Sequence, residues 1–155
     1  MVEYSENGMK KKLKWYTLDE VKARLLPSKK DGNPKDSIGS TKVPISTVSS
    51  PVIMEIGLGM LEGAAKYGRH NYRVDGLRGS VYYDAAMRHF MAWWEGEDID
   101  PESGIHHLGK AMSCLSVLRD AMIQDNWYDD RPPKTKDGWV QEMNKKAKEV
   151  LAKYP

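Results

Sequence analysis

The 155-residue sequence contains a single cysteine, Cys114. An intrachain disulfide framework is therefore excluded, and a reducing compartment is indicated. No apolar run approaches the roughly 20 residues that cross a bilayer, and the lysine-rich beginning of the chain has no apolar segment after it. We therefore predict neither a membrane span nor a signal peptide, and we expect a cytoplasmic protein.

A strong net charge is also missing, because the formal charge is only +2. Near-neutral charge argues against a dedicated nucleic-acid-binding protein, although the ends are basic and the middle is acidic. With 40% hydrophobic residues, the chain suits one globular domain with polar ends. We predict a flexible arm with a short helix at 1–34, a helical core at 35–122, and an irregular segment with a terminal helix at 123–155.

Three helical patterns make up the predicted core. One helix begins at Ser50-Pro51, a cap followed by proline, and stops at Tyr67-Gly68. Two more carry apolar residues at spacings of three and four. Their predicted buried faces are Tyr82, Ala85, Ala86, His89, Phe90 and Trp93, and then Leu108, Ala111, Met112, Leu115, Leu118 and Met122.

Smaller features surround this core. Thr17 and Glu20 form a capping-box pattern for a short helix, and Ser80 is the predicted cap of the second core helix. At most a short extended piece is expected at 43–45, and a terminal helix at 140–152. The sequence shows no internal repeat and no convincing strand pair, so the predicted fold is all-α: a helical bundle with small flanking helices.

Five carboxylates crowd the turn between the second and third core helices, with no basic residue among them. Each close pair of charges costs about 1 kcal/mol in water and about 4 kcal/mol at a partly buried site. A hard divalent cation would neutralise them, so we expect Mg²⁺ or Mn²⁺. An acidic, solvated surface loop explains the same pattern. The run is Glu95, Glu97, Asp98, Asp100 and Glu102, and the predicted metal ligands are Glu95, Glu97, Asp98 and Asp100.

Two histidines accompany this turn. His89 lies on the apolar face of its helix, either as a hydrogen-bonded core residue or to orient a metal-bound carboxylate. His107 lies at the edge of the next helix's buried face, whereas His106 points away. Zinc is disfavoured because no Cys-x-x-Cys or His-x-x-x-His pair is present. The predicted catalytic residues are Glu95, Glu97, His89 and His107.

A basic loop, KYGRHNYRVDGLRGS, begins at Lys66. Basic side chains opposite an oxygen-rich metal site are the combination that polyphosphate chemistry requires. The alternative is a polar connection, in which Lys66 only pairs with Glu62 and Arg88 only pairs with Asp84. The predicted substrate-binding residues are Lys66, Tyr67, Arg69, Asn71, Tyr72, Arg73 and Arg88.

Several stretches together resemble one known family. They are LEGAAKYG at 61–68, Asn71-Tyr72-Arg73, AAMRHFMAWWEGEDIDPESG at 85–104, and HLGKA at 107–111, with the approach segment KDSIGSTKVPIS. The pattern spans roughly Lys35 to Ala121. It is similar to phage-associated dATP/dGTP diphosphohydrolases, the MazZ-type relatives of MazG-like nucleotide pyrophosphohydrolases.

This resemblance implies an all-α enzyme that cuts purine deoxynucleoside triphosphates to monophosphate and pyrophosphate with Mg²⁺ or Mn²⁺. It also implies a homo-oligomer, a dimer or tetramer, in the host cytoplasm if the protein is phage-encoded. One departure concerns the metal-binding motifs, because E-x-x-E is missing from the core helices. The E-x-x-D from Glu95 to Asp98 straddles a helix end, and His107 with Lys110 stand where the E-x-x-D of the next core helix is expected.

Two other functions compete with this hypothesis. One is a His/Asp metal phosphohydrolase that releases phosphate or triphosphate, but the chain lacks the adjacent His-Asp pair typical of that centre. The other is a helical module without enzymatic activity, which binds nucleic acid through its lysine-rich ends and a protein through the acidic turn. Product analysis separates the first from pyrophosphate release, and trimming the ends tests the second.

Overall fold

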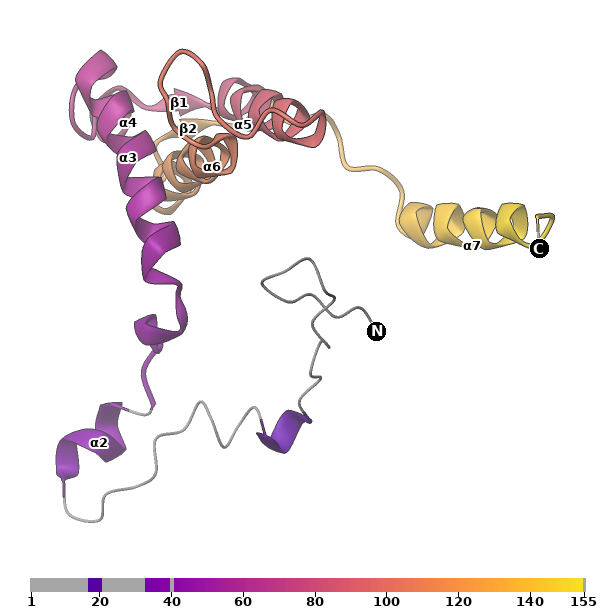
Figure 1. Cartoon of the computed structure of the whole chain (residues 1–155), viewed down its shortest axis with the longest axis horizontal. Coiled ribbons are helices and arrows are strands. Elements are labelled where there is room, and N and C mark those ends of the chain that lie inside the picture. Colours follow the sequence, from indigo (N-terminus) through magenta and orange to yellow (C-terminus); the bar gives the residue numbers. More distant parts are fainter. Residues whose placement is uncertain (1–16, 21–32, 40, 155) are drawn as a thin grey trace, which may run out of the picture. The chain divides into compact units, whose positions relative to one another are not determined.

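The computed structural model describes residues 17–20, 33–39 and 41–154. Its contacts divide the chain into two units, Met1–Ser50 and Pro51–Pro155. The segment boundaries predicted at 34/35 and 122/123 stay predictions. In chain order the elements are α2 (Pro34–Gly39), η1 (Ile45–Thr47), α3 (Ser50–Tyr67), α4 (Tyr72–Asp75), β1 (Leu77–Arg78), α5 (Gly79–Trp94), α6 (His107–Ile123), β2 (Trp127–Tyr128) and α7 (Trp139–Leu151) (Figure 1).

The first unit contains the predicted capping box. The backbone N–H of Thr17 donates to Glu20 Oε2 at 2.8 Å, and the N–H of Glu20 donates to Thr17 Oγ1 at 3.2 Å. The rest of that predicted helix lies outside the described residues, as does most of the predicted arm. The helix α2, which begins with a proline at its first position, was not predicted. Of the short extended piece expected at most at 43–45, Pro44 has extended backbone, whereas Ile45 begins the 3-10 helix η1.

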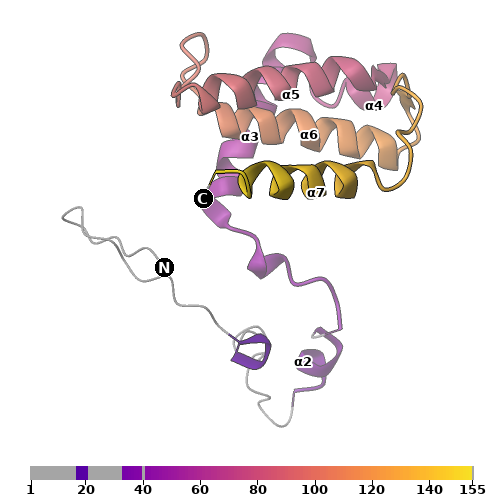
Figure 2. The same cartoon turned by 90° about the vertical axis from the view of Figure 1, so that its right-hand side faces the viewer.

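Helices α5 and α6 form an antiparallel hairpin and lie side by side in both views (Figures 1 and 2). Ala86 is 2% exposed between them, and Tyr82 and His89 are half-buried. The predicted face of α5 therefore turns toward α6. The hairpin at the centre of the second unit and the all-α class are both confirmed.

The predicted face of α6 is partly wrong. Leu115 is 43% exposed, whereas Ala111, Val117 and Ala121 are buried. Ser113 is also buried, because α3 packs against a second side of α6. A helix covered on two sides has a wider buried surface than one apolar stripe indicates.

Small residues bring α3 close to α6 where it runs across the hairpin (Figure 2). Ser113 Oγ donates to the carbonyl oxygen of Ile56 at 2.9 Å. A Cβ built on Gly59 would overlap Ser113 Oγ and lie 2.9 Å from Ser113 Cβ. Gly68, with φ +94°, follows the last residue of α3 as predicted.

The strands β1 and β2 form a short parallel pair that was not predicted. This pair joins the segment before α5 to the segment after α6. Leu77 pairs with Trp127, and Arg78 pairs with Tyr128. Strands of two residues are too short to leave an alternating pattern in the sequence. The predicted capping role of Ser80 is also wrong, because α5 begins at Gly79 and Ser80 donates its own N–H to Asp130 Oδ1 at 2.8 Å.

The predicted terminal helix is present as α7, which follows Gly138 at φ +83°. Its ion pairs include Lys146 with Glu142 and Lys145 with Glu149, each four residues apart. Within the described ranges, no helix combines the length and the apolar character needed to cross a bilayer.

Candidate functional site

A cavity of about 750 Å³ opens among α3, the loop that follows it, α5 and α6. This volume is in the range of small-molecule binding sites. Four basic side chains line it, and Glu62 is the one carboxylate residue in its lining among the described residues. The cavity is therefore suited to a polyanion. Its basic residues are Lys66, Arg69, Arg88 and Lys110, and its tyrosines are Tyr67, Tyr72 and Tyr82.

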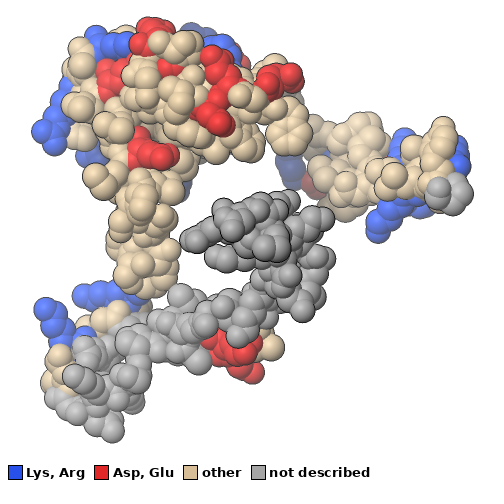
Figure 3. Space-filling view, in the orientation of Figure 1, with Lys and Arg blue, Asp and Glu red and all other residues tan. Residues whose placement is uncertain are grey.

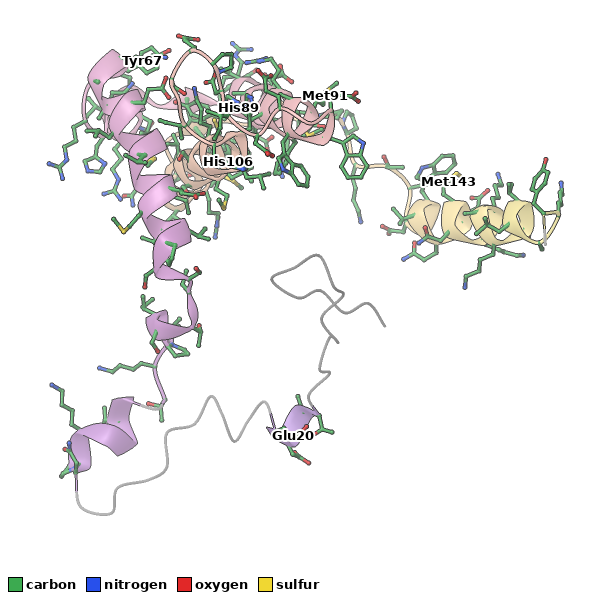
Figure 4. The ribbon with its side chains drawn as sticks, in the orientation of Figure 1. Glu20, Tyr67, His89, Met91, His106 and Met143 are labelled. Carbon is green, nitrogen blue, oxygen red and sulfur yellow. The ribbon has the colours of Figure 1, made fainter. Side chains whose placement is uncertain are left out.

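The structure brings six of the seven predicted substrate-binding residues to this cavity: Lys66, Tyr67, Arg69, Asn71, Tyr72 and Arg88. Tyr67 at the end of α3 is 70% exposed (Figure 4), whereas Tyr72 is 6% exposed within the core. Arg88 forms no ion pair with Asp84 in the described part of the chain.

Arg73 lies apart from this group. Its Nε and a terminal nitrogen donate to the two carboxylate oxygens of Asp120 at 2.6 and 2.8 Å. This two-pronged ion pair fixes α4 on α6. Arg73 does not line the cavity, and its predicted contact with substrate stays a prediction.

Glu62 belongs to an ion-pair network at the cavity wall. Its Oε1 accepts from Lys66 Nζ at 2.7 Å, and its Oε2 lies 3.1 Å from Lys110 Nζ. Lys110 Nζ also makes a short contact with Asp100 Oδ2. Asp100 accepts further hydrogen bonds from the N–H of Glu102 and the hydroxyl of Ser103, at 3.1 and 2.9 Å. The network joins α3, the acidic turn and α6.

The network fixes the charges of its members. Burial raises the pKa of Glu62, but hydrogen bonds from Lys66 and Lys110 outweigh that effect and leave the pKa below its usual value. The hydrogen bond from Lys110 holds the pKa of Asp100 far below its usual range. Burial lowers the pKa of Lys110, and its bonds to Asp100 and Glu62 more than reverse this. All three groups are charged at neutral pH.

The four predicted metal ligands do not converge on one point. Asp100 turns inward to Lys110, whereas Glu97 Oε2 lies 3.5 Å from His107 Nε2 and Asp98 Oδ1 lies 4.0 Å from His106 Nε2. Glu95 is exposed, and acidic residues are scattered over the visible face of the helical body (Figure 3). No three such residues within the described ranges could hold a metal ion. As they lie, these residues do not fit a divalent ion held by this chain, and the predicted need for Mg²⁺ or Mn²⁺ stays a prediction.

His89 and His107 form a pair behind the cavity wall. Their Nδ1 atoms are 2.9 Å apart, so one ring donates and the other accepts. Neither lines the cavity, and the buried His107 Nε2 has no hydrogen-bond partner among the described residues. The nearby His106 instead caps α6, because its Nδ1 accepts from the N–H of Leu108 at 3.1 Å. The predicted catalytic histidines therefore contact each other outside the cavity lining, and their catalytic role stays a prediction.

The histidine pair predicts a loss of stability in mild acid. Burial, the charge of Lys110 and the neighbouring His107 all lower the pKa of His89 below 6.5. A histidine with a lowered folded pKa stabilises the fold above its unfolded pKa, and this contribution is lost as the pH falls below it. We expect the free energy of unfolding to fall from pH 7.5 to 5.5, by up to about 1.4 kcal/mol per pH unit for one proton.

Urea denaturation at several pH values measures how the free energy of unfolding changes with pH. His89→Gln keeps a neutral, hydrogen-bonding side chain and should reduce this dependence on pH. An unchanged slope in this variant would show that other groups cause the pH dependence.

Sequence reasoning missed Glu62, Lys110 and Tyr82 as residues of the cavity. Glu62 was considered only as a helix-surface partner of Lys66. Lys110 was noticed only as a departure from a motif. Its position one turn after His107 is the signal that places it on the same side of α6.

Comparisons with known proteins agree on one family. The family model described as "dATP/dGTP diphosphohydrolase, N-terminal" matches residues 32–131. A dATP/dGTP diphosphohydrolase of Salmonella phage PMBT28 is 34% identical over 77 residues, which are 50% of this chain and 26% of that protein. The matched segment thus spans about a quarter of that relative's length. No solved structure matches the chain.

Proposed function

Because this chain belongs to the dATP/dGTP diphosphohydrolase family, we propose that it hydrolyses purine deoxynucleoside triphosphates to the monophosphate and pyrophosphate. The observation that carries the proposal is the cavity wall, on which four basic residues surround one carboxylate. Such a wall neutralises a triphosphate and still offers an anionic group to the attacking water.

In this proposal the cations hold the phosphates and Glu62 orients the water. The carboxylate of Glu62 is ionised, and it accepts a hydrogen bond from the water that attacks the α-phosphorus. A new bond forms between that phosphorus and the water oxygen, and the bond to the oxygen bridging to the β-phosphorus breaks. The proton of the water passes to the Glu62 carboxylate and from there to solvent. The leaving pyrophosphate takes the charge that Lys66, Arg69 and Arg88 stabilise.

Mg²⁺ or Mn²⁺ enters this proposal as part of the substrate, bound to the triphosphate. Glu62 in the cavity lining and Asp100 beside it both pair with Lys110. Glu95, Glu97 and Asp98 are exposed on the turn, and no lysine or arginine among the described residues pairs with them.

We also propose a MazG-like homo-oligomer, a dimer or tetramer. Large apolar side chains remain exposed along α3 and α5, which supports burial against another copy. Ile53, Leu58 and Leu61 are 45%, 52% and 65% exposed, and Met91 and Trp94 are 62% and 78% exposed. Light scattering of the purified chain measures the number of copies in the oligomer. A monomer at all concentrations would contradict the proposed homo-oligomer.

Product analysis tests the proposed reaction. The full chain is incubated with each of the four deoxynucleoside triphosphates and Mg²⁺ or Mn²⁺, and pyrophosphate, phosphate and triphosphate are quantified separately. We expect pyrophosphate and monophosphate from dATP or dGTP. Release of phosphate or triphosphate would favour the His/Asp phosphohydrolase, and no turnover of any substrate would refute both.

Arg88→Ala should weaken substrate binding, because Arg88 lines the cavity and has no carboxylate partner in the described part of the chain. Losing one charged hydrogen bond of about 1.5 kcal/mol corresponds to roughly a tenfold rise in KM. Arg119→Ala is the matched control, since Arg119 is exposed on α6 away from the cavity lining. Steady-state kinetics measure both, and equal KM values would contradict a role of Arg88 in binding.

A further inference from the structure

The ammonium group of Lys110 lies in a position lined by oxygen atoms from separate elements. Glu62 comes from α3, and Asp100 and Ser103 come from the acidic turn. Nζ is 3.1 Å from Glu62 Oε2, 3.1 Å from Ser103 Oγ, and in short contact with Asp100 Oδ2. Only 12% of the Lys110 side chain is exposed.

Such a set of oxygens is chemically suited to a hard cation as well as to an ammonium group. Two carboxylates that converge from different elements, with a hydroxyl beside them, are ligands that Mg²⁺ and Mn²⁺ accept. Without any cation between them, Glu62 and Asp100 would repel each other at a poorly solvated point. The side chains of these two carboxylates are only 18% and 11% exposed. A positive charge at this point is therefore required by the fold.

The chain supplies that charge itself. Lys110 is fixed on the first turns of α6, and Lys66 adds a second ammonium 2.7 Å from Glu62 Oε1. An ammonium group neutralises carboxylates and donates hydrogen bonds. It has no coordination position to offer a phosphoryl oxygen, however, and it excludes a divalent ion from the same point by charge and by volume.

We propose that Lys110 is the resident cation of this site and takes the place of a protein-bound divalent ion between Glu62 and Asp100. The chain without nucleotide should then bind Mn²⁺ weakly, and removal of the ammonium should uncover a site for one Mn²⁺. The inference deepens the proposed function, because a divalent ion would then reach the cavity with the triphosphate. Its test uses no nucleotide, so its failure is distinct from a failure of the proposed hydrolysis.

Titration of the full chain with Mn²⁺ alone, followed by the electron paramagnetic resonance signal of free Mn²⁺, tests the proposal. We expect the unmodified chain to bind with a Kd of about 1 mM or weaker, as expected of a site without free carboxylates. Lys110→Ala should bind one Mn²⁺ at least roughly tenfold more tightly, because Asp100 and Glu62 both lose the ammonium of Lys110, and Glu62 then keeps only its pair with Lys66. Lys110→Arg, which keeps the charge, should stay weak.

Two controls separate this site from general charge effects. Lys110→Ala combined with Asp100→Asn removes one uncovered ligand and should lose the gain. Lys134→Ala removes a surface lysine that pairs only with Asp137, 2.5 Å away, and should change nothing. Circular dichroism checks that each variant is folded, and Lys110→Met, which keeps the apolar stem, replaces Lys110→Ala if the latter unfolds.

Tight Mn²⁺ binding by the unmodified chain, in the micromolar range, would overturn the proposal by itself. So would a folded Lys110→Ala or Lys110→Met variant whose affinity for Mn²⁺ equals that of the unmodified chain.

Discussion

Gly59→Ala should destabilise the protein strongly, although alanine favours a helix more than glycine does. A methyl group at this position would overlap Ser113 Oγ and lie 2.9 Å from Ser113 Cβ. Both belong to α6, so α3 must move away, and the hydrogen bond from Ser113 to Ile56 is lost with it. Overpacking of this kind costs roughly 1–3 kcal/mol.

Gly57→Ala is a matched control two residues earlier on α3. No atom lies within 4 Å of a Cβ built there, so only the helix preference acts. That preference should stabilise the protein by about 0.5–1 kcal/mol. Thermal unfolding should therefore shift in opposite directions for the two variants, with melting temperatures differing by roughly 5–10 °C.

A double variant locates the clash. Ser113→Gly removes both atoms that a new Cβ at position 59 would meet, so it should recover much of the loss in Gly59→Ala. Equal melting temperatures for Gly57→Ala and Gly59→Ala would show that α3 does not approach α6 closely at this point.

Asp100→Asn should cost about 3 kcal/mol of unfolding free energy, the loss typical of breaking a buried ion pair on one side. Asp100 is 8% exposed and binds the ammonium of Lys110. The amide keeps the shape of the side chain but not its charge, so Lys110 keeps its contacts with Glu62 and Ser103 but loses one carboxylate. The pKa of the Asp100 carboxyl is lowered in the fold, so the stabilisation is present above about pH 4 and is lost as the pH falls further.

Asp98→Asn is the control for Asp100→Asn. It lies in the same turn, but its side chain is 72% exposed, and a nitrogen of His106 lies 4.0 Å from its Oδ1. Its removal should change the unfolding free energy by less than about 0.5 kcal/mol. Urea denaturation of both variants measures the difference. Equal stability would contradict a structural role for the inward-facing carboxylate.

Much of the helical framework could be predicted, because long amphipathic helices leave a periodic pattern and their ends carry glycine. The stop at Gly68 and the hairpin of α5 and α6 are examples. The exposure of Leu115 and the burial of Ser113 were not predicted. Periodicity shows that a helix has an apolar stripe, but it does not show which neighbouring helices cover which sides of α6. The strand pair at Leu77 and Trp127 depends on contacts between residues 50 apart, which local patterns do not encode.

The candidate site was predictable in part. Clusters of basic residues in one loop pointed to the cavity, since a loop keeps its members near each other. The acidic turn suggested a cluster of metal ligands, but the number of charges in a turn does not show which way each side chain points. Asp100 faces inward and its neighbours Glu97 and Asp98 face outward. Lys110 became visible only when the packing of α6 placed its ammonium between α3 and that turn.

The carboxylate of Asp130 gives the fold a dependence on chain length. It accepts both the N–H and the hydroxyl of Ser80, which lies 50 residues earlier. During synthesis, the first turn of α5 therefore lacks its anchor until residue 130 has left the ribosome. An excised fragment meant to keep the cavity must likewise run past this aspartate, close to residue 131, where the family match ends.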